Sequence, residues 1–160
     1  PLLYTDKQLV MFEPKRKSEA MPFSLQMDAE GVNALLRRAF PDGPDAYFPS
    51  VTEVEPGRVL VVRPYHASML RPGELVSGPT LMGLADTAAY ALVLSHVGEQ
   101  LMAVTSSLVM NFLRGARPGD IFAEAQMLRL GRRNAVCDVR LWTEGPQRLA
   151  AQATVTYAIP

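Results

Sequence analysis

The stretch that decides the fold is Pro79–Val97, which reads PTLMGLADTAAYALVLSHV. Its proline suits the first turn of a helix, Ser77 or Gly78 stands at the capping position before it, and Gly98 is a typical C-terminal stop. Apolar and small residues occur all round this helix, so we expect it to be buried on most sides. The length approaches that of a membrane span, but Asp86 and the small polar residues argue against one.

The sequence after this helix predicts four strands with period-two alternation, joined by turns that contain glycine and proline. They cover residues 101–113, 121–127, 135–141 and 149–159. In the first of them the even positions are apolar, which predicts that Thr105, Ser107 and Asn111 lie on the opposite face. Before the central helix, Asp28–Phe40 predicts an amphipathic helix, residues 51–65 a hairpin around Pro56-Gly57, and 66–77 a loop.

This order of elements predicts an α+β domain in which an antiparallel sheet wraps around one long central helix, at about residues 79–97. Residues 1–27 show no clean period, and we expect an N-terminal arm there, followed by a single domain at 28–160. The last strands form a meander in this prediction. Their edges need cover, which favours a dimer that continues the sheet.

Composition excludes several classes of protein. The chain has 160 residues, and 16 Lys+Arg balance 16 Asp+Glu, so the basic excess of a nucleic-acid-binding protein is lacking. With 48% hydrophobic and 20% charged residues, the chain is not expected to be disordered. Cys137 is the single cysteine, which excludes an intrachain disulfide and, with two histidines, argues against a metal site. No signal peptide begins the sequence, which predicts a cytoplasmic protein without a membrane segment.

Asp86 is the exception in the central helix, because it is the only Asp, Glu, Lys or Arg between Glu74 and Glu99. A buried carboxylate costs free energy unless hydrogen-bond donors or water compensate it. Two interpretations remain open. Asp86 is either a structural residue that bonds neighbouring amides, or a carboxylate that serves as general base or nucleophile.

Other side chains differ in how well they fit a place near this carboxylate. Tyr90 follows Asp86 by four residues on the same helix face, where it would shape a pocket. His66 precedes the helix and is a weaker candidate for lining the site. His96 ends the helix, where a cation suits the helix dipole, and we interpret it as structural. Cys137 alternates with core residues and is expected to be a small buried hydrophobe.

Four segments carry a resemblance to a known family. Ser77-Gly78-Pro79, followed by Leu84-Ala85-Asp86-Thr87-Ala88, resembles the helix signature of the PaaI / 4-hydroxybenzoyl-CoA thioesterase superfamily, whose members have the hotdog fold. Residues 105–120, 131–136 and 150–159 are similar to the strand and turn signatures of that family in the same order. Together the four segments cover roughly residues 50–160.

The resemblance implies hydrolysis of an acyl-CoA thioester. It gives Asp86 the role of activating water or attacking the carbonyl, and the backbone amide of Gly78 the role of polarising the thioester oxygen. A hydroxyl on the following strand, usually from the partner subunit, positions the water, and Thr105 and Ser106 both remain candidates. A dimer or a tetramer is implied, with no metal and no cofactor besides the coenzyme A of the substrate.

The sequence departs from the family pattern at the start of the helix. Ser77 replaces the family's histidine, where it either caps the helix or contacts substrate, and Pro79 replaces the second glycine. Since proline has no N–H, only Gly78 can donate at that corner. Arg132 and Arg133 follow a tight turn and are the candidates for contacting the phosphates of coenzyme A, while Arg114 and Arg117 are weaker ones.

Two alternatives to hydrolysis remain. One is a non-catalytic hotdog module that binds acyl-CoA. The other is a hotdog dehydratase or hydratase, which ranks last because that chemistry uses a histidine paired with an acid, and no histidine lies in the helix motif. The sequence leaves open the acyl group and whether coenzyme A or acyl carrier protein carries it.

Overall fold

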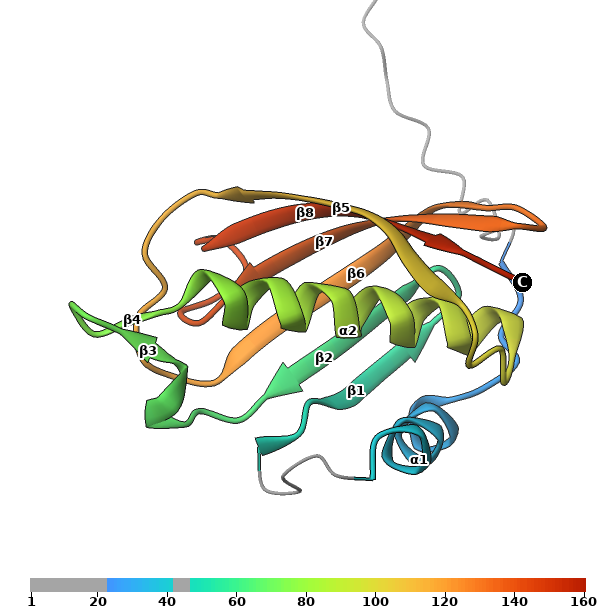
Figure 1. The fold of residues 1–160 in the computed structure, drawn as a ribbon, viewed down its shortest axis with the longest axis horizontal. Coiled ribbons are helices and arrows are strands. Elements are labelled where there is room, and N and C mark those ends of the chain that lie inside the picture. The colour runs from blue at the N-terminus through green and yellow to red at the C-terminus, as the bar shows by residue number, and fades with distance from the viewer. Residues whose placement is uncertain (1–22, 42–46) are drawn as a thin grey trace, which may run out of the picture.

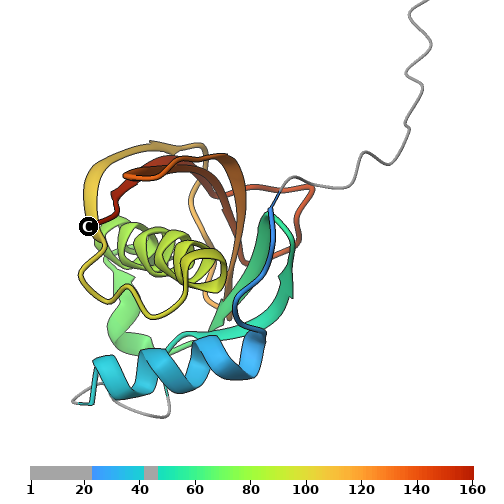
Figure 2. The same cartoon turned by 90° about the vertical axis from the view of Figure 1, so that its right-hand side faces the viewer.

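A long helix crosses the inner face of a curved antiparallel sheet in the computed structural model, which describes residues 23–41 and 47–160 (Figure 1). The end view in Figure 2 shows the sheet curving over the helix. The elements are α1 (Ala29–Ala39), β1 (Ser50–Glu55), β2 (Arg58–Arg63), β3 (Leu70–Arg71), β4 (Leu75–Val76), α2 (Gly78–Val97), β5 (Val104–Phe112), β6 (Ile121–Leu130), β7 (Asn134–Trp142) and β8 (Ala151–Ala158). This arrangement confirms the predicted fold.

The central helix α2 begins and ends where its capping residues predict. The Ser77 side chain accepts from the Thr80 N–H at 3.4 Å, and Gly98 ends the helix at a φ of 80°. By length and composition α2 could cross a membrane, but 67% of its most apolar window is buried inside the fold. That burial is typical of the core helix of a globular domain.

The predicted meander is wrong in one connection. β6, β7 and β8 are consecutive neighbours, but β5 pairs with β8 and the sheet order is β1-β2-β6-β7-β8-β5. β6 has no free edge for β5, because β2 and β7 occupy its two sides. Instead of a tight turn, the β5–β6 connection spans the end of the sheet, where the Ala116 carbonyl accepts from Val76 N–H and Asp120 accepts from Tyr65 N–H. Among the strands of the described residues, β5 therefore pairs only with β8, which leaves its other edge free.

A bulge near the start of β5 changes the predicted face of Thr105. Pairing with β8 shifts register between Thr105 and Ser107, so that Ser106 is the extra residue. Strict alternation places Thr105 on the outer face. The bulge instead places it opposite Tyr157, on the inner face that α2 covers.

The N-terminal part of the described chain packs against both α2 and the hairpin. Asp28 caps α1 by accepting from the Gly31 N–H at 2.9 Å, as predicted. Before it, residues 23–27 run along the end of α2, where two of their N–H groups donate to the carbonyl of Ser95. The rest of the predicted arm, residues 1–22, lies outside the described residues. The predicted loop at 66–77 contains a short 3₁₀ helix and the β3–β4 pair.

His96 is structural, but the predicted cation is wrong. Its side chain is buried, and Nε2 accepts from the Gly57 N–H at 2.9 Å. A ring nitrogen that accepts carries no proton, so His96 is neutral, and burial lowers its pKa. Cys137 is buried on β7 as predicted, and burial raises the pKa of its thiol to about 12.

Candidate active site

Asp86 lies half-buried on α2, where it faces strands β5 and β8. Two hydroxyls hold its carboxylate: Thr105 Oγ1 donates to Oδ1 at 2.5 Å, and Tyr157 donates to the same oxygen at 2.8 Å. Among the described residues, none donates a hydrogen bond to Oδ2. One carboxylate oxygen is therefore fixed, and the other is available to water or substrate.

Tyr157 is the contact of the Asp86 carboxylate that the sequence analysis missed. It comes from β8, and its hydroxyl also approaches the Asp86 backbone carbonyl at 3.3 Å. Burial raises the pKa of this phenol, and the charge of Asp86 raises it further, so the hydroxyl remains a donor. A signal was present, because Tyr157 continues an inner-facing series of the smaller residues Ala151, Ala153 and Val155.

A cavity of about 340 Å³ opens beside the carboxylate. Tyr90, which was predicted to shape such a pocket, lies in its wall, stacks on Tyr157 at 5.6 Å and donates to the Leu101 carbonyl at 2.9 Å. The remaining wall is mostly apolar and comes partly from α1 and the segment after it, which the sequence did not predict. The lining residues are Leu36, Phe40, Phe48, Asp86, Thr87, Tyr90, Leu101, Ala103, Val104, Thr105 and Tyr157.

Gly78 lies at a second cavity, of about 500 Å³, at the N-terminal end of α2. Its N–H is one of the first-turn amides that no intrahelical carbonyl can accept. A β-carbon at this position would lie 3.3 Å from the Phe112 ring, so glycine permits the close approach of β5. Asp86 lies eight residues further, about 12 Å along the helix at 1.5 Å per residue. Within one chain, Gly78 and Asp86 therefore face different cavities.

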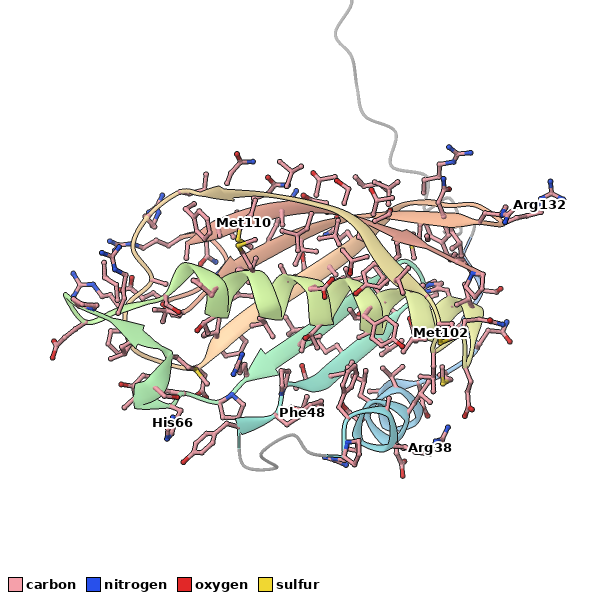
Figure 3. The ribbon with its side chains drawn as sticks, in the orientation of Figure 1. Arg38, Phe48, His66, Met102, Met110 and Arg132 are labelled. Carbon is pink, nitrogen blue, oxygen red and sulfur yellow. The ribbon has the colours of Figure 1, made fainter. Side chains whose placement is uncertain are left out.

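The other predicted residues lie apart from Asp86. Ser77 Oγ is held 2.8 Å from Thr80 Oγ1 at the start of the helix, and Ser106 Oγ donates to the Thr156 carbonyl at 3.2 Å. Arg132 and Arg133 occupy the exposed turn between β6 and β7, which contributes no residue to the wall of the Asp86 pocket. Figure 3 shows Arg132 extending from that end of the sheet.

The weaker candidates for the site do not reach the carboxylate. His66 Nδ1 lies 2.7 Å from Ser68 Oγ, and its ring packs on Tyr47 outside the pocket wall. In the described part of the chain, His, Cys, Asp and Glu side chains form no group of three or more that could bind a metal. The structure thus brings together Asp86, Thr105 and Tyr90, and the Thr105 contact forms within a single chain.

Comparison with known proteins assigns the family. The model of the thioesterase superfamily matches residues 73–150. A proposed thioesterase from Silicibacter sp. TM1040 is 36% identical, and its crystal structure gives a TM-score of 0.78 over 86% of this chain and 95% of that one. The chain belongs to the thioesterase superfamily.

More distant relatives agree with this assignment. The phenylacetic acid degradation protein PaaI from Thermus thermophilus is 28% identical, with a TM-score of 0.63 over 72% of this chain and 96% of that one. A proposed esterase from Thermoplasma acidophilum is 24% identical over 109 residues, which cover 68% of this chain and 81% of that protein. These likenesses support thioester hydrolysis as the general activity of this thioesterase.

Proposed function

We propose that this thioesterase hydrolyses acyl-CoA to a free acid and coenzyme A, with Asp86 as general base or nucleophile. The observation that carries the proposal is the carboxylate itself. Two hydroxyls anchor Oδ1, which leaves Oδ2 for the reaction, and Asp86 borders a largely apolar pocket that suits an acyl group.

Either route breaks the same bond. As general base, Asp86 accepts a proton from the water that attacks the thioester carbon. As nucleophile, Oδ2 attacks that carbon, and water then hydrolyses the mixed anhydride. In both routes the carbon–sulfur bond breaks, the coenzyme A thiolate leaves, and the acyl group departs as a carboxylic acid. Water is the only other reactant, so we propose no metal and no separate cofactor.

The Gly78 amide is the proposed donor to the thioester oxygen, and its distance from Asp86 supports a dimeric site. Asp86 touches Thr105 near one end of β5, and Gly78 touches Phe112 at the other end. A two-fold axis at the middle of β5 would pair this strand antiparallel with its copy. The Gly78 end of one chain would then lie opposite the Asp86 end of the other.

The free edge of β5 supports this dimer. Unpaired strand edges associate unless charge or cover prevents it. Large apolar side chains on and next to this strand are exposed: Met102, Val104, Val109, Phe112 and Leu113. We propose that a second copy covers this edge, and a tetramer of such dimers remains a further prediction.

Arg132 and Arg133 remain the proposed contacts for the phosphates of coenzyme A, because they are exposed and have no acidic partner among the described residues. Arginine's planar fork suits phosphate oxygens. A cytoplasmic location likewise remains a prediction from the sequence.

Thioester hydrolysis across a panel of acyl-CoAs, followed with a thiol reagent, tests the proposed activity. We expect wild-type protein to release coenzyme A and Asp86→Ala to release almost none. Binding by the wild type with no hydrolysis of any panel member would favour the acyl-CoA-binding module instead.

Sedimentation tests the dimer with a matched pair of variants. Val109 on β5 and Leu128 on β6 are both 60% exposed. Lysine at position 109 places a charge at the proposed interface, so Val109→Lys should dissociate the dimer and lower activity, whereas Leu128→Lys should do neither. A fully active monomer would contradict the dimeric site.

A further inference from the structure

A continuous series of aromatic rings leads away from the catalytic carboxylate. Tyr157, which bonds Asp86, stacks on Tyr90 at 5.6 Å; Tyr90 meets Phe40 edge to face at 6.4 Å and 76°; and Phe40 meets Phe48 at 6.4 Å. All four rings line the Asp86 pocket. In this order of contacts, Phe40 and Phe48 follow Tyr157 and Tyr90 along the pocket wall. Figure 3 shows Phe48 beside β1, at some remove from α2.

The backbone of Phe40 is fixed by a hydrogen bond, but its side chain is not part of the hydrophobic core. It is the C-terminal cap of α1, and its N–H donates to the Leu36 carbonyl at 3.0 Å. α1 is itself fixed to β1, since the Asn33 side chain exchanges two hydrogen bonds of 2.8 Å with the backbone of Val51. Yet the Phe40 residue is 51% exposed. An aromatic ring that lines the pocket and keeps half of its surface uncovered is suited to contact an apolar ligand.

The chemistry of the pocket wall defines the occupant. Among the described lining residues Asp86 is the only charged one, and the rest are apolar or carry a hydroxyl. A thioester carbonyl at Asp86 would therefore extend an uncharged hydrocarbon chain along Tyr90 towards Phe40. The volume of about 340 Å³ lies near the lower end of the range for ligand pockets, about 300–1,000 Å³. A cavity of this volume limits the length of the acyl chain that it can hold.

We propose that Phe40, backed by Phe48, sets the length of acyl chain that the pocket accepts. This inference rests on the proposed hydrolysis of acyl-CoA. Each methylene that the pocket buries should raise kcat/KM about fourfold. We expect kcat/KM to stop rising at the length where the acyl chain reaches Phe40, because further methylenes stay in water or collide with the ring. The chain length at which kcat/KM stops rising is called the break.

The experiment measures kcat/KM for saturated acyl-CoAs from acetyl to hexadecanoyl. Phe40→Ala should move the break in this series to chains longer by about three methylenes, fewer than the ring carbons removed because the cavity partly collapses. Phe40→Trp should move the break to shorter chains. Phe122→Ala is the matched control, since Phe122 lies on the outer face of the sheet, stacked on Trp142, and it should keep the wild-type break.

An unchanged break in both Phe40→Ala and Phe40→Trp, with both variants folded by circular dichroism, would overturn the inference and leave the proposed hydrolysis standing. Calorimetric binding of the same series separates the two proposals if the wild type hydrolyses none of it. Affinities that rise and break with length, with a break that moves in the two variants, would support the pocket assignment while hydrolysis fails. Affinities without a break would overturn it.

Discussion

The two halves of α2 differ in their surroundings and in composition, since Gly, Pro, Thr and Asp occur only in the first half, residues 78–87. Every residue from Ala88 to His96 is buried, whereas in the first half only Leu81, Leu84 and Ala85 are. Met82, at 40% exposure, and Gly83 face outward there, and Asp86 stands at the boundary between the halves. The buried half of α2 packs into the hydrophobic core beneath the sheet, and the uncovered half carries Gly78 and Asp86, which are proposed to act on the thioester.

This difference shows how one helix can serve stability and function together. In the buried half, alanines such as Ala88 and Ala91 allow the sheet to pack closely around the helix. In the uncovered half, a carboxylate is tolerated because hydroxyls and solvent compensate it. Substitutions in the two halves should therefore affect different measurements.

The largest effect on stability is expected in the buried half. Leu92 is completely buried, so Leu92→Ala should lower the free energy of unfolding by about 2–5 kcal/mol through lost burial and a residual cavity. Met82→Ala, in the uncovered half, should change it by no more than about 0.5 kcal/mol. Urea unfolding measures both. Equal losses would show that the two halves do not differ in the way described.

Next in size is the hydroxyl that holds Asp86. A hydrogen bond to a charged group contributes about 1.5–3 kcal/mol, so Thr105→Val should lower kcat roughly tenfold to a hundredfold. Thr105→Ser should recover most of the rate, because it keeps the hydroxyl. Ser106→Ala should remain close to wild type, since Ser106 bonds a strand carbonyl instead. Loss of activity in Ser106→Ala alone would reverse the assignment.

A smaller effect is expected on the pH dependence of stability, through His96 near the end of the buried half of α2. His96 is held neutral with a lowered pKa, whereas an unfolded chain takes up a proton at a pKa of about 6.5. The contribution of neutral His96 to the free energy of unfolding is thus complete above about pH 6.5. It is lost as the pH falls from there towards the pKa of His96 in the folded protein, by at most about 1.4 kcal/mol per pH unit. His96→Gln should flatten this slope in urea unfolding between pH 7.5 and 5.5. An unchanged slope would assign it to other groups.

The smallest effect is expected far from the carboxylate, at the exposed β6–β7 turn. Replacing Arg132 and Arg133 together by alanine should raise KM for acyl-CoA by about threefold to tenfold with little change in kcat, as exposed charge pairs contribute up to about 1 kcal/mol each. A thioester of the same acyl group without the nucleotide serves as control and should show no change. If KM for acyl-CoA stays constant, the phosphates bind elsewhere.

Local signals made most of the fold predictable. The Ser77 cap, the proline after it and Gly98 predicted the ends of α2 to within one residue, and alternation predicted the four later strands. The pairing of β5 with β8 could not be read in this way, because a neighbour in the sheet is chosen by which edges remain free.

The residues of the candidate site also differ in whether a local sequence pattern predicts them. Asp86 was predicted as the only charged residue of the central helix, and Tyr90 because it follows Asp86 by four residues on the same helix face. Thr105 was a candidate through the family resemblance, together with Ser106, and spacing did not decide between them. Alternation predicted that Thr105 faces outward, and the bulge at Ser106 turns it inward. Alternation predicts that Tyr157 lies on the inner face of its strand, but no local pattern predicts that Tyr157 or Phe40 meets the pocket on α2.

One measurement tests the central claim most directly: single-turnover hydrolysis of the best acyl-CoA by wild-type protein and by Asp86→Asn, with binding of the same acyl-CoA measured on both. Asparagine keeps the shape of the side chain and removes the base, so we expect turnover to fall by roughly two to four orders of magnitude while the fold and the affinity persist. Hydrolysis by Asp86→Asn at the wild-type rate would show that Asp86 is structural and would contradict the mechanism.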